Sequence, residues 1–120
     1  MSATPSYVPA QGDIVAFKKT APTAGHEQHE DRPWMVLTPR IFNKASGLLL
    51  AAPITNQSKG LDMEVAVKGV AGVSGVVLTF QVRTLDWQSR GAILKGRASA
   101  AMVKQASSYV TAMVKYSPGG

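Results

Sequence analysis

Two polar segments contain the residue types that could act on a phosphodiester. Residues 25–33 read Gly-His-Glu-Gln-His-Glu-Asp-Arg-Pro, and residues 53–60 read Pro-Ile-Thr-Asn-Gln-Ser-Lys-Gly. RNA carries its own nucleophile, the 2′-hydroxyl. Its cleavage therefore needs a base for that proton, a cation for the charge on the phosphorane and an acid for the leaving 5′-oxygen. Glu27 could be the base, Arg32 could grip the phosphate with its fork of donors, and Thr55 and Ser58 could hydrogen-bond its oxygens.

Two other interpretations of the first segment stay open. The first is a zinc site, although the sequence has no cysteine and no third histidine to complete a closed shell. Its ligands would come from His26, Glu27, His29, Glu30 and Asp31. The second is a solvated, charged loop with no ligand, which spacing alone favours. We expect no metal and no cofactor.

Composition limits the class of protein. The chain has 120 residues, so we expect a single domain over residues 1–120 with flexible ends at 1–10 and 117–120. The absence of cysteine excludes a disulfide scaffold and a thiol nucleophile. A net charge of +6 suits an anionic partner, nucleic acid first. No apolar run approaches the roughly 18 residues of a membrane span, and residues 1–9 do not resemble a signal peptide, so we expect a cytoplasmic location and no membrane partner.

Short β-type runs separated by Gly and Pro must position the two polar segments. The predicted strands cover residues 13–17, 34–37, 48–52, 63–67, 76–78 and 81–85, with one more between Gly91 and Gly96. Residues 41–46 predict a short helical turn, and residues 20–32 and 54–61 predict loops. Pro33 and Pro39 bracket the second strand because neither fits inside a central strand.

The C-terminal part predicts one helix that begins at Ser99, a typical N-cap. Its apolar residues recur at helical spacing as a single stripe: Met102, Val103, Ala106, Tyr109, Val110, Met113 and Val114. Many short strands and one terminal helix indicate a mainly β protein, a small and strongly curved barrel or sheet.

Several motifs in this order resemble the MazF/PemK family of toxins from type II toxin–antitoxin modules. They are Gly12-Asp-Ile, Ala24-Gly-His-Glu-Gln, Arg32-Pro, Val36-Leu-Thr-Pro39, Phe42-Asn43, Pro53-Ile-Thr-Asn-Gln-Ser-Lys-Gly60, Gly75-Val-Val and Gln81-Val-Arg-Thr-Leu-Asp86. The resemblance covers residues 7 to 116 and depends on their shared order and spacing. It implies a small SH3-like β-barrel (CcdB/PemK-like) with a C-terminal α-helix.

The same resemblance implies a function and partners. The expected activity is that of a ribosome-independent endoribonuclease, an mRNA interferase, which cuts single-stranded RNA at a short sequence without a metal. The expected products are a 2′,3′-cyclic phosphate and a 5′-hydroxyl. The expected partners are a second copy in a homodimer and a cognate acidic antitoxin of MazE type, whose tail covers the RNA groove and suits the positive charge.

The resemblance also implies roles for individual residues. Glu27 matches the general base, Arg32 the residue that balances transition-state charge and protonates the leaving group, and Thr55 the ligand of the scissile phosphate. The RNA-binding residues it implies are His26, Gln28, Asn56, Gln57, Ser58, Lys59, Phe80 and Gln81.

The sequence departs from the PemK/Kid branch of the family at two positions. That branch uses an Arg and an Asp where this chain has Leu78 and Phe80, neither of which can move a proton. The departure favours the Glu27/Arg32 scheme and leaves Phe80 to stack a base or to alter the specificity pocket.

Two alternatives to the nuclease remain open. One is a non-catalytic CcdB-like toxin that binds DNA gyrase, and the other is a basic SH3-like binding module without activity. The combination of Glu27, Arg32 and Thr55 favours the nuclease, because a gyrase poison would not need it.

Overall fold

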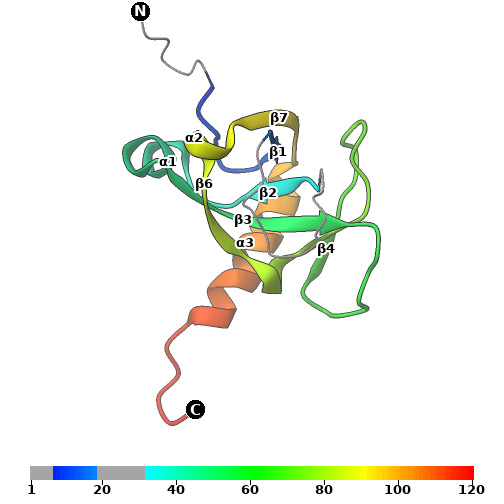
Figure 1. Cartoon of the computed structure of the whole chain (residues 1–120). Helices are drawn as coiled ribbons and strands as arrows, with labels where there is room; N and C mark the ends of the chain where they lie inside the picture. The colour runs from blue at the N-terminus through cyan, green and yellow to red at the C-terminus, as the bar shows by residue number, and fades with distance from the viewer. Residues whose placement is uncertain (1–6, 19–31) are drawn as a thin grey trace, which may run out of the picture.

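The computed structural model describes residues 7–18 and 32–120 (Figure 1). Its strands are β1 (Asp13–Phe17), β2 (Trp34–Val36), β3 (Leu48–Thr55), β4 (Glu64–Ala66), β5 (Val76–Leu78), β6 (Arg83–Asp86) and β7 (Ala92–Arg97). Its helices are α1 (Arg40–Ser46), the 3₁₀ turn η1 (Thr79–Gln81), α2 (Trp87–Arg90) and α3 (Ala100–Val114). The mainly β fold class with a C-terminal helix is therefore confirmed.

One antiparallel sheet contains all seven strands. They pair in the order β4-β5-β3-β2-β1-β7, and β6 pairs with β3 beside β5. The sheet curves around one side of α3, which gives the barrel-like shape seen in Figure 1. β3 is the central strand, because it pairs with β2 along one edge and with β6 and then β5 along the other.

β3 extends further than the strand that the sequence predicted over residues 48–52. We expected a polar loop from residue 54, but β3 continues through Pro53 to Thr55. Pro53 is tolerated because the pairing with β6 ends at Ala51 and the pairing with β5 begins at Ile54. Pro53 has no N–H, but it lies between these two pairings, where neither β6 nor β5 needs a donor from β3.

Three other expectations about elements were wrong. Gln81 belongs to η1 and not to a strand, and β6 begins at Arg83. The four-residue helix α2 was not predicted, and Gly96 lies inside β7 instead of ending it. α2 is capped at both ends: Asp86 accepts a hydrogen bond from the Ser89 N–H at 2.9 Å, and Gly91 follows in the left-handed conformation.

Two groups of buried side chains pack on opposite faces of the strands. Alternate residues of β1, β2 and β3 divide between them: Ile14 and Met35 belong to the group that contacts α3, and Val15 and Val36 to the other. Trp87 is 3% exposed in the second group and donates from Nε1 to the Asn43 carbonyl at 2.9 Å.

α3 is attached to the sheet through its first half. Ser99 caps it as predicted and accepts a hydrogen bond from the Met102 N–H at 3.2 Å. Met102 and Ala106 are buried. The last turn differs from the predicted stripe, because Val114 is 77% exposed beyond the reach of the sheet (Figure 1).

Residues at the start of the described chain are hydrogen-bonded to the first strand. The Tyr7 hydroxyl donates to the buried carboxylate of Asp13 at 2.6 Å, and the Ala10 N–H donates to the same oxygen at 3.0 Å. Arg97 forms an ion pair with the other oxygen at 3.3 Å. Burial, reinforced by the bond to Asp13, raises the pKa of Tyr7 above its ordinary range. Tyr7 and Ala10 are thus joined to β1 through Asp13.

Within the two described ranges, no helix combines the length and the apolar character needed to cross a membrane.

Candidate active site

Arg32 and Thr55 meet at the same end of two neighbouring strands. β2 and β3 pair with Trp34 opposite Pro53, and the Ile54 N–H donates to the Pro33 carbonyl at 2.9 Å. Arg32 directly precedes Pro33 and Thr55 directly follows Ile54, so both residues adjoin this last hydrogen bond between the two chain segments. The structure thus brings together two of the three predicted catalytic residues.

The Thr55 hydroxyl is available to donate. It accepts a hydrogen bond from the Gln57 N–H at 3.1 Å, and it donates to no acceptor in the part of the chain that the structure describes. A hydroxyl can accept and donate at once, so its hydrogen is free for a phosphate oxygen. Arg32 is exposed and lies two residues before β2.

Gly75 fixes the backbone at Thr55 from the other side. It directly precedes β5, whose Val76 pairs with Thr55. Its φ of +114° lies in the region that favours glycine, and a Cβ placed there would collide with the Thr55 carbonyl group. Gly75 belongs to a motif that carried the family resemblance, but the sequence did not indicate which residue it contacts.

The second polar segment folds around Glu64, a residue that the sequence analysis missed. Oε1 of Glu64 accepts a hydrogen bond from the Ser58 hydroxyl at 2.5 Å, and Oε2 accepts one from the Lys59 N–H at 2.6 Å. The bond from Ser58, with a smaller effect from the Lys59 N–H, lowers the pKa of Glu64 from its ordinary value of 4.5. The hydrogen of Ser58 is thereby committed to Glu64, whereas we had expected it to reach a phosphate.

The other residues of that segment are displayed on its surface. Asn56, Gln57 and Lys59 are exposed, and the Asn56 Oδ1 accepts a hydrogen bond from the Ser74 hydroxyl at 3.1 Å. This contact ties the loop after β3 to the loop before β5, so the two flank Thr55 together.

Other predicted site residues lie on a different element or in the part of the chain that the structure does not describe. Phe80 and Gln81 occupy η1, which packs against α3 and β3, with Phe80 half-buried and Gln81 exposed. Leu78 is 2% exposed and therefore serves the core. The candidates in residues 19–31 are outside the described residues: His26, Glu27, Gln28, His29, Glu30 and Asp31. The zinc interpretation falls on the same segment.

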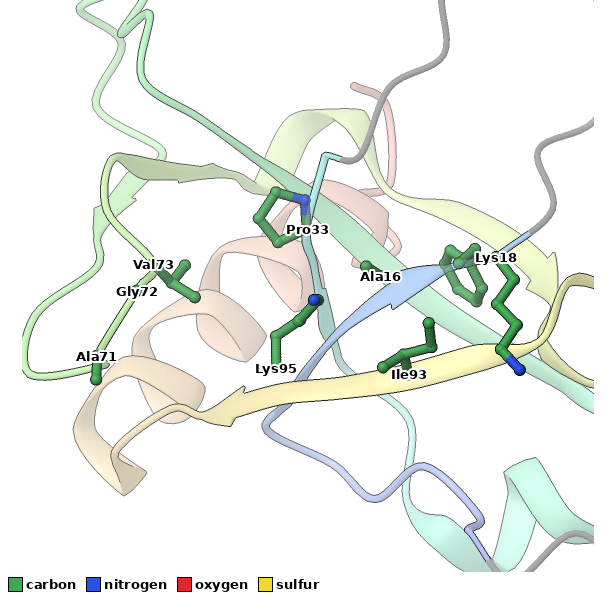
Figure 2. Close-up of a pocket in the computed structure, with 9 residues that line it drawn as sticks. Ala16, Lys18, Pro33, Ala71, Gly72, Val73, Ile93 and Lys95 are labelled. Carbon is green, nitrogen blue, oxygen red and sulfur yellow. The ribbon is translucent and has the colours of Figure 1, made fainter.

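A groove of about 630 Å³ runs along β1 and β7 beside this strand end (Figure 2). Lys18 and Lys95 line it together with the apolar side chains of Ile93 and Val73, and no acidic residue is among the described residues that line it. Pro33, the neighbour of Arg32, lines its upper side in Figure 2, and Lys95 extends from β7 toward it. The groove adds positive charge close to the site.

Fold and site together define a small, basic, barrel-like β protein whose central strand ends in a threonine hydroxyl close to an arginine. A family model described as "PemK-like, MazF-like toxin of type II toxin-antitoxin system" matches residues 10–114. The chain therefore belongs to this toxin family, and the resemblance seen in the sequence is confirmed.

Known relatives agree with this assignment. The chain is 42% identical over 90 residues to the endoribonuclease toxin MazF of Escherichia coli K12, a match that covers 75% of this chain and 79% of that protein. It is 37% identical over 110 residues to the endoribonuclease toxin ChpB of the same strain, covering 88% and 93% of the two chains. Among solved structures, a MazE–MazF complex from Deinococcus radiodurans (Form-II) gives a TM-score of 0.83 at 38% identity, over 93% of this chain and 100% of that chain. The predicted enzyme class, an endoribonuclease, is confirmed at the level of the family.

Proposed function

We propose that this chain is a sequence-specific, ribosome-independent endoribonuclease toxin that cleaves single-stranded RNA, mRNA in the cell, by a metal-free reaction. The proposal is supported by the hydrogen bond from the Ile54 N–H to the Pro33 carbonyl, which brings the neighbouring residues Arg32 and Thr55 to the same end of two chain segments. A guanidinium and a hydroxyl held at one strand end can bind the two non-bridging oxygens of a single phosphate.

The reaction is an attack of the 2′-hydroxyl on the adjacent phosphorus. The 2′-oxygen bonds to phosphorus, the P–O5′ bond breaks, and the products are a 2′,3′-cyclic phosphate and a 5′-hydroxyl. Glu27 takes the proton of the 2′-hydroxyl, and the leaving 5′-oxygen receives a proton from Arg32. Glu27 is assigned to this step by the family resemblance and by the chemistry of a carboxylate, since it lies outside the described residues.

Arg32 and Thr55 stabilise the charge that develops during this reaction. The phosphorane carries more negative charge on its non-bridging oxygens than the ground state does, so donors fixed there favour the transition state. Asn56, Gln57 and Lys59 then contact neighbouring nucleotides from the same loop. His26, Gln28, Phe80 and Gln81 belong to the proposal as RNA-binding residues on the resemblance alone.

Two protein partners are part of the same proposal. The net charge of +6 and the lysines of the groove suit an acidic antitoxin of MazE type, and the Deinococcus relative is a MazE–MazF complex. The second partner is another copy of this chain in a homodimer.

The test is to incubate the purified protein with a long RNA in EDTA and to map the ends of the fragments. We expect cuts at one recurring short sequence, and 5′ ends that a polynucleotide kinase phosphorylates without prior dephosphorylation. An RNA carrying a single 2′-deoxy nucleotide 5′ to the cut should be resistant there, because it lacks the nucleophile. Glu27→Ala and Arg32→Ala should each slow cleavage at that sequence by about a hundredfold or more.

Three results would contradict the proposal. Cleavage of the 2′-deoxy substrate at the same position would exclude the cyclic phosphate route. Cuts by the two variants at the wild-type rate would remove both residues from the chemistry. Intact RNA together with gyrase-dependent DNA damage would favour the CcdB-like alternative.

A further inference from the structure

Glu64 is an acidic side chain beside the RNA-binding loop that the cleavage chemistry does not use. It begins β4, and hydrogen bonds occupy both of its carboxylate oxygens, 2.5 Å from the Ser58 hydroxyl and 2.6 Å from the Lys59 nitrogen. The Ser58 Oγ accepts a further bond from the Gly60 N–H at 3.1 Å. The carboxylate therefore holds Ser58 and Lys59 directly, and it holds Gly60 through the Ser58 hydroxyl.

The charge of Glu64 acts against the proposed substrate. A carboxylate near the RNA backbone repels phosphate, and it partly offsets the attraction of a neighbouring lysine. If charge were its only effect, removing Glu64 would tighten RNA binding. Its position is better explained by the loop that it holds.

The loop is fixed at both ends by short contacts. At its start, the Gln57 N–H donates to Thr55, the proposed phosphate ligand. At its end, the Glu64 N–H donates to the Leu61 carbonyl at 3.3 Å, so Glu64 closes the loop with its backbone as well as with its side chain. A loop fixed before RNA arrives loses little conformational freedom on binding.

We propose that Glu64 is a positioning residue whose carboxylate fixes Ser58, Lys59 and Gly60, so that the loop presents Lys59 and Thr55 to RNA in a preformed shape. This inference rests on the proposed function, because it concerns the RNA affinity of that same site. Replacing Glu64 should therefore change KM for RNA and leave the rate of the bond-breaking step unchanged.

The experiment compares Glu64→Gln with Asp62→Asn in full-length protein. Both variants remove one negative charge from the same region, but Asp62 is exposed and has no place in the proposed site. Glu64→Gln should raise KM for an RNA substrate roughly tenfold and leave kcat within about twofold, because the amide has one acceptor oxygen in place of two and lacks the charge that strengthens both bonds. Asp62→Asn should leave KM unchanged or lower it. Amide hydrogen exchange at Lys59 and Gly60 should be faster only in Glu64→Gln.

Ser58→Ala is a second, milder variant in case Glu64→Gln does not fold. It removes one of the two bonds to Glu64, so it should also raise KM. A variant with both Ser58→Ala and Glu64→Gln should have a KM no higher than that of Glu64→Gln alone. A KM for Glu64→Gln or Ser58→Ala at or below the wild-type value, with wild-type protein cutting RNA normally, would overturn the assignment. Wild-type protein that cuts no RNA would instead overturn the proposed function.

Discussion

At the scale of single residues, the proposed site combines the guanidinium of Arg32, just before β2, with the hydroxyl of Thr55 at the end of β3. Neither Arg32 nor Thr55 is buried, and neither packs in the two groups of core side chains. We expect them to act in RNA cleavage through their position at the strand ends and to contribute little to the free energy of unfolding. Changes at these residues should therefore separate activity from folding.

Arg32→Ala should lower kcat/KM for RNA cleavage by about 10²–10³-fold, the usual cost of one lost transition-state donor. The free energy of unfolding should change by less than about 0.5 kcal/mol, since the side chain is exposed. Arg32→Lys should recover part of the activity, because it keeps the charge but loses the fork. Steady-state kinetics and thermal melts on the same samples measure both effects. A fall in melting temperature that parallels the loss of activity would contradict this account.

The carboxylate of Glu64 should titrate below its ordinary pKa of 4.5, because it is hydrogen-bonded in the folded state. With the folded pKa below the unfolded value, ionised Glu64 stabilises the loop above pH 4.5, and this stabilisation is lost as the pH falls through the folded pKa. An NMR titration of the side-chain carboxyl carbon measures the midpoint, which Ser58→Ala should move back toward the ordinary value. A wild-type midpoint at or above 4.5 would show that the two hydrogen bonds do not persist in solution.

The sequence predicted Arg32 and Thr55 as site residues but could not predict that they lie at the same end of neighbouring chain segments. Their proximity follows from the strand register, which depends on pairings made across the whole sheet. Glu64 was missed because nothing in its local pattern distinguishes it from any acid at the start of a strand. Its partners become visible only when the loop is folded.

At the scale of elements, the end of β3 is held between two loops. Gly75 and the Asn56–Ser74 contact lie on one side of Thr55, and the loop closed by Glu64 follows it. Figure 1 shows these loops projecting from the same end of the sheet. The site is therefore an assembly of strand ends and not the product of one loop.

Gly75→Ala should shift Thr55 and reduce RNA cleavage. Its Cβ would meet the Thr55 backbone, and the left-handed conformation adds about 1–2 kcal/mol of strain. Gly72→Ala is the matched control, because Gly72 has a φ of +79° and nothing within 4 Å of a new Cβ. Both variants should lower the melting temperature, but only Gly75→Ala should lose activity beyond what the melting temperature accounts for. Equal activity in the two variants would show that the contact does not position Thr55.

Elements with a regular apolar pattern were predicted well, whereas the short helix α2, which is defined by its caps, was not. The alternation in β1 and the apolar run of β2 were enough to place both strands. α2 is too short for any periodicity, although Asp86 and Gly91 are the residue types that cap a helix at its two ends. The exposed last turn of α3 could not be predicted, because an apolar stripe does not show where the sheet beneath it ends.

At the scale of the whole molecule, positive charge spreads well beyond the strand end that holds the site. The chain carries +6, and Lys18 and Lys95 line the groove along β1 and β7. This distribution favours a long anionic chain over a small charged ligand. In the proposed function, the site selects the bond that is cut and the surrounding charge attracts the RNA.

RNA binding should therefore weaken steeply with salt. A plot of log K against log salt should be linear with a negative slope, and Lys59→Ala should reduce the magnitude of that slope by about 0.7, as expected for one lost contact to a single strand. Lys104→Ala, on the exposed face of α3, should leave the slope unchanged. Fluorescence anisotropy with a labelled oligonucleotide at several salt concentrations measures it. A slope that is the same for wild type and Lys59→Ala would remove Lys59 from the RNA path.

A double-mutant cycle between Arg32 and Thr55 in RNA cleavage measures whether the two side chains hold the same phosphate. Both residues are proposed to hold the same phosphate, so Arg32→Ala and Thr55→Val should each cause a large loss of kcat/KM, and the double variant should lose much less than the product of the two. Losses that multiply fully would mean that the two side chains act independently, and would contradict a shared phosphate site at the end of β2 and β3.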